Sequence, residues 1–225
     1  LNLMCEWLDL PAGSSVADLG SGWGNFSKFA SMNFQWNVTG YTLSNAQLNY
    51  CKELAVKNLI DDRVSFEDRD MLVTTSPTPF DGVVMIESIE HVGQKNLVSF
   101  FKEIKQILKP DRLCIIQTSG RYVARPFDRW TQKYVFPGGY LPTKDELFFA
   151  ATNAGFRVEE FRDDTPDYIR TMSSWIQNLE SQRDDIEREF GKPFYRLWEL
   201  WTHGAKVKFE MGAMNLFRLR LRSSK

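Results

Sequence analysis

The feature that most constrains the fold is a glycine-rich turn, Asp18–Gly24 (DLGSGWG), which joins two different hydrophobic patterns. Before it, Ser15–Asp18 has the pattern of a short buried strand, and after it the apolar residues of Asn25–Met32 recur at helical spacing. Glycine adopts backbone dihedrals that are forbidden to other residues, and a helix that follows such a turn offers free N–H groups to a ligand. The turn therefore predicts an α/β domain that binds a ligand at this point.

Strand and helix patterns alternate along the rest of the chain, which favours a mostly parallel sheet with helices on both faces. Ser44 has the position of a helix N-cap. Seven strands are expected, over 15–18, 36–41, 63–66, 80–86, 113–117, 156–161 and 214–221. Further helices are expected over 44–57, 96–108, from 143 onward, 169–189 and 194–209. A length of 225 residues suits a single domain over 1–225.

Two stretches depart from this alternation. Residues 121–142 are aromatic and rich in Gly and Pro, and an irregular segment of that length is typical of a cover over an active site. Residues 169–210 form a second, helical insertion, in which basic residues alternate with acidic ones as on a solvated face, and His203 is interpreted as structural. The helical spacing of its aromatics favours core positions over an acyl channel or a membrane contact for Trp175, Phe190, Phe194, Tyr195, Trp198 and Trp201.

Composition excludes several classes of protein. A net charge of −1 and a pI of 6.2 argue against a nucleic-acid partner. Three cysteines without a CxxC motif argue against a disulfide framework and a metal site, and indicate a reducing, cytoplasmic location. No apolar run approaches the roughly 18 residues that a membrane span needs. The chain begins with Leu1 rather than Met, so we expect an N-terminal segment to precede it.

The spacing of the glycines bears on the type of ligand. Gly20, Gly22 and Gly24 form G-x-G-x-G, whereas a dinucleotide site uses G-x-G-x-x-G with an acidic residue at the end of the second strand. Here the second strand ends in Thr42–Ser44 (TLS). The turn therefore disfavours NAD and suits a smaller, cationic cofactor.

A second polar constellation follows the fourth strand. The segment Glu87–Gly93 (ESIEHVG) brings two acids and one of only two histidines to the carboxyl end of a central strand. Open α/β sheets bind their ligands at that edge. We therefore predict catalytic roles for Glu90 and His91.

With these segments in place, the chain resembles the cyclopropane-fatty-acid synthase family, which includes the mycolic acid cyclopropane synthases and related methyltransferases. The FPGG-x-LP element is more specific than the glycine turn. The matching segments, in order, are Asp18–Gly24, Val38–Ser44 (VTGYTLS) with Gln47, Phe80–Asp81, Glu90–Gly93 (EHVG), Leu108–Pro110, Gln117–Thr118, Phe136–Pro142 (FPGGYLP) and Tyr168–Thr171 (YIRT). The resemblance implies a Rossmann-like class I methyltransferase fold with a helical, aromatic lid insertion.

The resemblance also implies the cofactor and the reaction. S-adenosylmethionine is expected to bind at Asp18, Gly20, Gly22, Gly24, Thr42, Leu43, Gln47, Asp70, Met71 and Ile86. The substrate would be an unsaturated lipid, methylated at an acyl double bond through a carbocation, with peripheral contact to a membrane surface. A bound bicarbonate would accept the proton, held by groups at Ser21, Glu90, Gln117, Ser119 and Tyr168.

Three of these positions depart from the family pattern, which usually has Cys at Ser21, often has His at Gln117 and commonly has Ile at Ser119. Serine and glutamine still donate hydrogen bonds, but a weaker base would favour a methylene or methyl-branched product over a cyclopropane.

Two rival interpretations stay open at this point. A branch resembling the coclaurine-type N-methyltransferases of plants also carries a Glu-His pair and would methylate a small amine. Its segments tend toward EHM and FTGGTMP, so EHVG and FPGGYLP favour the lipid interpretation. A non-catalytic lipid- or cofactor-binding relative is the other rival, and the presence of both Glu90 and Tyr168 argues against it.

Overall fold

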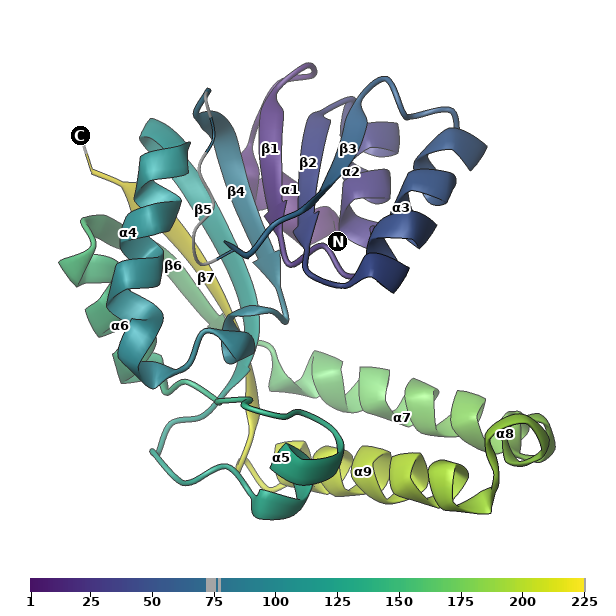
Figure 1. The fold of residues 1–225 in the computed structure, drawn as a ribbon. Coiled ribbons are helices and arrows are strands. Elements are labelled where there is room, and N and C mark those ends of the chain that lie inside the picture. Colours follow the sequence, from purple (N-terminus) through teal and green to yellow (C-terminus); the bar gives the residue numbers. More distant parts are fainter. Residues whose placement is uncertain (72–75, 77, 225) are drawn as a thin grey trace.

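The sheet has the predicted number of strands and the predicted mostly parallel arrangement (Figure 1). The computed structural model describes residues 1–71, 76 and 78–224. The strands are β1 (Ser15–Leu19), β2 (Asn37–Thr42), β3 (Val64–Asp68), β4 (Phe80–Ile86), β5 (Leu108–Gly120), β6 (Phe156–Asp163) and β7 (Asn215–Ser223). Their order is β3-β2-β1-β4-β5-β7-β6, and only β7 runs antiparallel to its neighbours. The fold prediction is confirmed.

Helices cover both faces of the sheet, and a helical arm extends beyond its carboxyl edge (Figure 1). The helices are α1 (Asn2–Leu8), α2 (Asn25–Phe34), α3 (Asn45–Lys57), α4 (Leu97–Ile107), α5 (Arg129–Tyr134), α6 (Lys144–Asn153), α7 (Thr165–Ser181), α8 (Arg183–Phe190) and α9 (Lys192–Glu210). The arm consists of α7, α8 and α9, with α5 beside α9. None of the helices in the described residues combines the length and apolar content needed to cross a bilayer.

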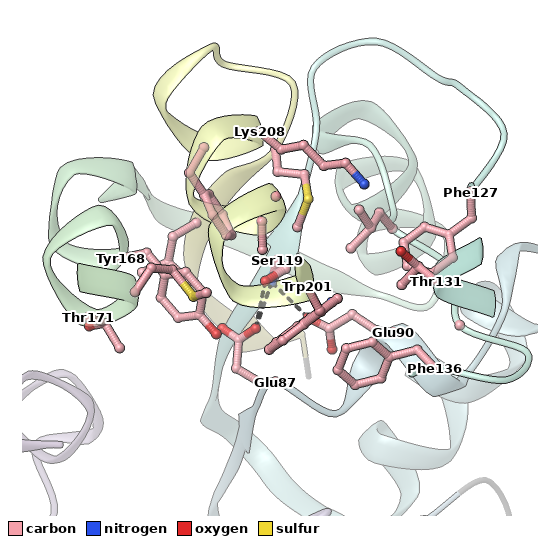
Figure 2. Close-up of a pocket in the computed structure, with 18 of the residues that line it drawn as sticks. Glu87, Glu90, Ser119, Phe127, Thr131, Phe136, Tyr168, Thr171, Trp201 and Lys208 are labelled. Carbon is pink, nitrogen blue, oxygen red and sulfur yellow. Dashed lines mark hydrogen bonds between the residues drawn. The ribbon is translucent and has the colours of Figure 1, made fainter. Parts of the chain in front are cut away.

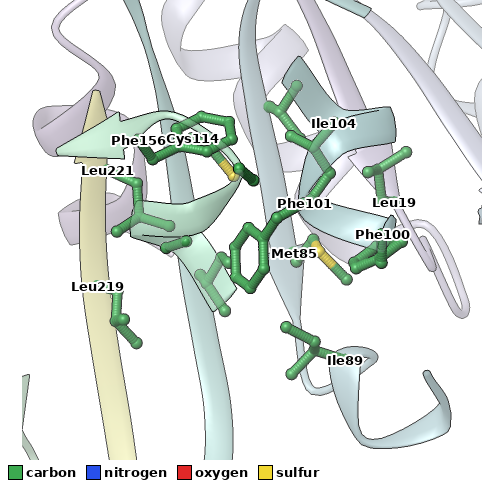
Figure 3. Close-up of a cluster of buried hydrophobic side chains, with 14 of the residues drawn as sticks. Leu19, Met85, Ile89, Phe100, Phe101, Ile104, Cys114, Phe156, Leu219 and Leu221 are labelled. Atoms are coloured by element: carbon green, nitrogen blue, oxygen red, sulfur yellow. The ribbon is translucent and has the colours of Figure 1, made fainter. Parts of the chain in front are cut away.

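Two hydrophobic cores lie on opposite faces of the sheet because side chains alternate along each buried strand. On β4, Val83 and Met85 belong to the core under α4 and α6, while Val84 belongs to the core under α1, α2 and α3. Figure 3 shows the first of these cores, where Phe101 of α4 packs toward the sheet. These cores fix the strand ends from which the polar groups of the site project.

Helix boundaries follow local capping groups. Ser44 is the N-cap of α3, as predicted, and its hydroxyl accepts a hydrogen bond from the Gln47 N–H. Within the stretch predicted to be irregular, Asp128 caps α5 by accepting hydrogen bonds from the Thr131 N–H at 2.7 Å and the Thr131 hydroxyl at 2.8 Å. The prediction that the whole lid is irregular is therefore wrong for Arg129–Tyr134.

The helix predicted over 169–189 is also corrected. It begins earlier, at Thr165, where the Asp163 carboxylate accepts hydrogen bonds from the Thr165 N–H and hydroxyl. It then divides at Gln182, whose φ of −109° and ψ of 17° are not helical, into α7 and α8. Tyr168 consequently lies in the first turn of α7.

The arm separates the predicted core aromatics into three groups. Tyr195 is 1% exposed and confirms the core prediction, and Trp198 and Trp201 are half-buried. Trp175, Phe190 and Phe194 are 43%, 55% and 41% exposed and contradict it. Helical spacing gives an apolar stripe, but a two-layer arm has no further layer to cover all of it. The predicted solvated charge pattern is confirmed by the exposed ion pair of Arg188 with Asp185, while Arg183 pairs with the half-buried Glu187. His203 Nδ1 lies 2.9 Å from the Glu199 carbonyl within α9.

Candidate active site

Two hollows meet at the carboxyl edge of the sheet. The first, which we call the acidic cavity, has a volume of about 640 Å³ and is lined from β4, β5, β7, the lid, α7 and α9. The second, the glycine pocket, has a volume of about 580 Å³ and is lined by the glycine turn and α2. Ile86, the last residue of β4, lines both. The two hollows therefore share a wall at Ile86.

The glycine turn has the backbone that its sequence predicts. Gly20, Gly22 and Gly24 have φ values of 81°, 55° and 75°, in the left-handed region, and Gly24 is the N-cap of α2. The N–H groups of Gly20 and Ser21 donate to the Tyr41 carbonyl at 3.1 and 2.9 Å, which fastens the turn to β2. Asp18, Gly20 and Gly22 line the glycine pocket, whereas Gly24 is not among the described residues that line it, and the cofactor contacts of all four stay predictions.

Asp18 is the acidic group of this pocket, whose lining also includes Lys28. Its carboxylate is 2% exposed and accepts a hydrogen bond from the Ser27 hydroxyl at 2.7 Å. Burial raises the pKa of Asp18 from 3.8 to about 6, although the Ser27 hydrogen bond opposes the shift. The group is therefore mainly ionised near neutral pH and suits a cationic ligand.

The described residues that line the glycine pocket do not include five further predicted cofactor residues: Thr42, Leu43, Gln47, Asp70 and Met71. The Thr42 hydroxyl donates to Gln47 Oε1 at 2.8 Å, and Leu43 is 65% exposed. Asp70 and Met71 follow β3 directly. The cofactor contacts of these five residues stay predictions.

Glu87, which was not among the predicted catalytic residues, lines the acidic cavity beside Glu90. Glu87 Oε2 accepts hydrogen bonds from the Ser119 hydroxyl at 2.7 Å and the Ser119 N–H at 3.2 Å. Glu87 Oε1 accepts from Gln117 Nε2 at 3.3 Å. Figure 2 shows the Glu87 carboxylate directed at Ser119, with the Tyr168 hydroxyl beside it. The only sequence signal for this role was its place directly after β4.

Glu90 reaches the same point of β5. Its Oε1 accepts hydrogen bonds from the Thr118 hydroxyl and the Ser119 N–H, both at 2.7 Å. Its Oε2 is buried and has no hydrogen-bond partner among the described residues. Burial and the neighbouring Glu87 raise the pKa of Glu90 well above its usual range, and burial also raises the pKa of Glu87. Both acids are therefore harder to ionise than a free glutamate, and the effect is larger for Glu90.

The predicted proton-acceptor set is divided by the structure. Gln117, Ser119, Glu90 and Tyr168 all line the acidic cavity, but Ser21 lines the glycine pocket, where its hydroxyl donates to the Tyr41 carbonyl at 3.3 Å. Sequence alone did not separate them, because the direction of the Ser21 side chain depends on its contact with β2.

Tyr168 and His91 occupy different depths of the cavity. The Tyr168 ring packs 4.8 Å from the Phe209 ring, and burial together with the carboxylates of Glu87 and Glu90 raises its pKa, so it stays a neutral phenol. His91 lines the cavity from an exposed position, with its ring 6.3 Å from that of Phe136.

The remaining wall of the cavity is largely aromatic, and much of it comes from the segment predicted to be a lid. The lid also contacts the arm, because Asp128 accepts a hydrogen bond from Lys208 at 2.8 Å. Phe136 packs 5.6 Å from Trp201 of α9. The aromatic residues that line the cavity are Phe127, Trp130, Phe136, Tyr140, Tyr168, Trp175, Trp201 and Phe209.

Comparison with known proteins identifies the family. The family model described as mycolic acid cyclopropane synthetase matches residues 1–219, nearly the whole chain. The chain belongs to this family. Membership confirms the resemblance inferred from the FPGGYLP and EHVG segments.

Proteins similar to the chain include three whose names describe the modification of lipids. A probable fatty acid methyltransferase of Pseudomonas putida is 28% identical over 222 residues, covering 96% of this chain and 56% of that protein. A cyclopropane-fatty-acyl-phospholipid synthase of Escherichia coli is 26% identical, covering 97% and 56%. A sphingolipid C9-methyltransferase of Candida albicans is 27% identical, covering 100% and 46%. The chain thus spans about half the length of these relatives.

Solved structures of the family share the fold. A cyclopropane synthase from Mycobacterium tuberculosis superposes with a TM-score of 0.91 at 22% identity, over 99% of this chain and 82% of that one. A mycolic acid cyclopropane synthase solved with SAH and CTAB gives the same values. At this identity the likeness establishes the class I methyltransferase fold.

Proposed function

We propose that this protein transfers a methyl group from S-adenosylmethionine to a carbon–carbon double bond in the acyl chain of an unsaturated lipid. The observation that carries the proposal is the acidic cavity, whose aromatic walls suit an apolar chain. Its half-buried acids, Glu87 and Glu90, lie near Ile86, which also lines the glycine pocket. Family membership and the lipid-modifying relatives support the same substrate class.

The residues of the glycine pocket fit S-adenosylmethionine. A buried carboxylate at Asp18 suits a cofactor that carries positive charge, and the positive φ values of Gly20 and Gly22 let backbone approach it closely. When bound, the cofactor supplies an electrophilic methyl group on a sulfonium sulfur. The residues of the glycine pocket would hold the cofactor, and Ile86, which lines both hollows, would stand between it and the acidic cavity.

The acidic cavity would orient the alkene and protect the cation that methylation creates. A neutral alkene needs no base before it reacts, only alignment in a site from which water is excluded. The faces of Trp201, Phe136 and Tyr168 lie around that site and can stabilise a carbocation. An ionised carboxylate at Glu87 would offset the positive charge electrostatically.

A bicarbonate ion, which the family resemblance implied, does not fit the residues present. The donors of Ser119 and Gln117 that would hold it already bind the Glu87 carboxylate. A further anion would stand beside an existing negative charge, and Ser21 is turned toward Tyr41 instead. The choice between a cyclopropane and a methyl-branched product stays a prediction.

The test is to supply cofactor labelled in its methyl group together with vesicles of an unsaturated phospholipid, with the saturated phospholipid as control. We expect label in the unsaturated lipid alone. A parallel panel of small cyclic amines tests the rival N-methyltransferase activity, and label in an amine but in no lipid would contradict the proposal. Label in no acceptor would favour a binding protein.

Cofactor binding should depend on pH through Asp18. Between 3.8 and about 6 the folded protein binds this proton and the unfolded chain does not, so the Asp18 contribution to stability falls as pH rises through that window. Cofactor affinity should change in the opposite sense, because it needs the ionised form. From about pH 7.5 to about pH 5.5 the dissociation constant should rise about fourfold. Titration calorimetry checks this, and Asp18→Asn should bind more weakly at both pH values without that dependence.

We also propose contact between the helical arm and a lipid surface. Phe190 and Phe194 stack with ring centroids 4.9 Å apart and are largely exposed, at the far end of the arm from the sheet. Aromatic side chains favour the interface between lipid and water. Replacing both by serine should reduce co-sedimentation with vesicles about tenfold, since each removes apolar area, while turnover of a detergent-dispersed substrate stays near that of the wild type. Unchanged co-sedimentation would refute this surface.

A further inference from the structure

The Glu87 carboxylate is built into the acidic cavity with its own set of donors. It receives hydrogen bonds from the Ser119 hydroxyl, the Ser119 N–H and Gln117 Nε2. Gln117 is itself oriented, because its Oε1 accepts a hydrogen bond from Arg218 Nε at 2.9 Å. In the described part of the chain no cation pairs with Glu87, since Arg218 pairs with Asp164. An ion pair therefore does not explain this half-buried acid.

The backbone of Glu87 supports the same point. Its φ of 52° lies in the left-handed region, which costs a non-glycine residue about 1–2 kcal/mol. The strain persists because β4 and β5 fix both sides of the residue, the Glu87 N–H donating to the Gln117 carbonyl at 2.9 Å. A carboxylate held in a conformation suited to glycine indicates a use at this position.

We propose that Glu87 is the base of the reaction and takes the proton that the methylated cation must lose. This inference rests on the proposed function and names the group that completes it. The C–H bond of the newly transferred methyl group breaks, and its electron pair forms the bond to the cationic carbon that closes the ring. The proton moves to a carboxylate oxygen of Glu87, which becomes neutral.

The other titratable groups of the cavity are less suited to this step. Glu90 is the weaker candidate of the two acids, because burial and the neighbouring Glu87 raise its pKa well above its usual range, and its Oε1 already accepts hydrogen bonds from Thr118 and Ser119. Tyr168 stays a neutral phenol beside two acids. His91 is at the exposed rim, against Phe136. Burial keeps Glu87 basic, because it raises the pKa of the carboxyl group that accepts the proton.

The experiment compares product formation in buffer stripped of carbon dioxide and bicarbonate, using an unsaturated phospholipid and S-adenosylmethionine. The wild type should keep its full rate there, because its base is part of the chain. Glu87→Gln should lose about 100-fold or more of the rate, the usual effect of removing a general base. Glu53→Gln, at an exposed position on α3, is the matched control and should keep the wild-type rate.

A second variant separates chemistry from folding. Glu87→Gly relieves the strained backbone and leaves a cavity lined by the Ser119 and Gln117 donors, which should accept a small carboxylate. In stripped buffer this variant should be as impaired as Glu87→Gln while binding the cofactor normally, and added formate should restore the rate at least about tenfold.

The outcomes distinguish the inference from the proposed function. If the wild type labels no unsaturated lipid, the proposed function fails. If the wild type labels lipid but loses its rate in stripped buffer, or if Glu87→Gln and Glu87→Gly keep the wild-type rate, only the assignment of Glu87 is overturned. Rescue of Glu87→Gly by formate supports that assignment directly.

Discussion

Replacing Gly20 by alanine should abolish cofactor binding while leaving a folded but weakened protein. The φ of Gly20 is 81°, and an alanine Cβ there would lie 2.4 Å from the Ser88 Cβ and 2.8 Å from its hydroxyl. Ser88 cannot retreat, because it is 5% exposed and its hydroxyl donates to the Leu19 carbonyl at 2.7 Å. The turn must therefore move, and with it the wall of the glycine pocket.

The expected magnitude combines two effects. Backbone strain costs about 1–2 kcal/mol and overpacking about 1–3 kcal/mol, so chemical denaturation should show a loss of about 2–5 kcal/mol. The dissociation constant of S-adenosylmethionine, measured by calorimetry well below the melting temperature, should rise at least about 100-fold. Gly13→Ala is the matched control, since Gly13 has the same φ of 81° but no atom within 4 Å of its Cβ position. Equal effects of the two variants on cofactor affinity would contradict this explanation.

The second large effect is expected at Glu90, where the two obvious substitutions should differ. Glu90→Leu removes the carboxyl oxygen that accepts hydrogen bonds from the Thr118 hydroxyl and the Ser119 N–H, and it takes the second acid away from Glu87. We expect a loss of about 1–3 kcal/mol of stability from the unsatisfied groups and about a 100-fold lower rate. Glu90→Gln keeps an acceptor oxygen and supplies N–H donors, so its rate should stay within about tenfold of the wild type.

This contrast follows from the protonation state of Glu90. Burial and the charge of Glu87 raise its pKa well above the usual range, so the wild-type residue acts as a neutral acid, which glutamine imitates. Steady-state rates and thermal unfolding of both variants provide the check. If Glu90→Gln were as impaired as Glu90→Leu, the ionised form of Glu90 would be the active one.

The sequence specified much of the fold because the decisive signals were local. The G-x-G-x-G spacing predicted the left-handed turn, Ser44 predicted the start of α3, and FPGGYLP predicted the family. Each depends on residues within a few positions of one another, where turn and capping chemistry act.

The role of Glu87 could not be predicted in the same way. Its hydrogen bonds to Ser119 span 32 positions and depend on the register that pairs Ile86 with Gln117. The protonation state of Glu87 depends on how close the fold brings it to Glu90, not on the number of residues between them. Similarly, Ser21 lies beside the predicted acids along one edge of the sheet, but its hydroxyl turns to Tyr41. The exposed aromatics of the arm were misassigned because helical spacing does not say whether a further layer covers them.

The most direct test of the account is the mass and fragmentation of an unsaturated phospholipid after turnover with S-adenosylmethionine deuterated in its methyl group. We expect an acyl chain that has gained one carbon at the former double bond. When a ring forms, the transferred methyl group should have lost one deuterium. The saturated phospholipid should be unchanged. An unlabelled acyl chain, or label found only on a head-group or amine nitrogen, would contradict methyl transfer to the alkene.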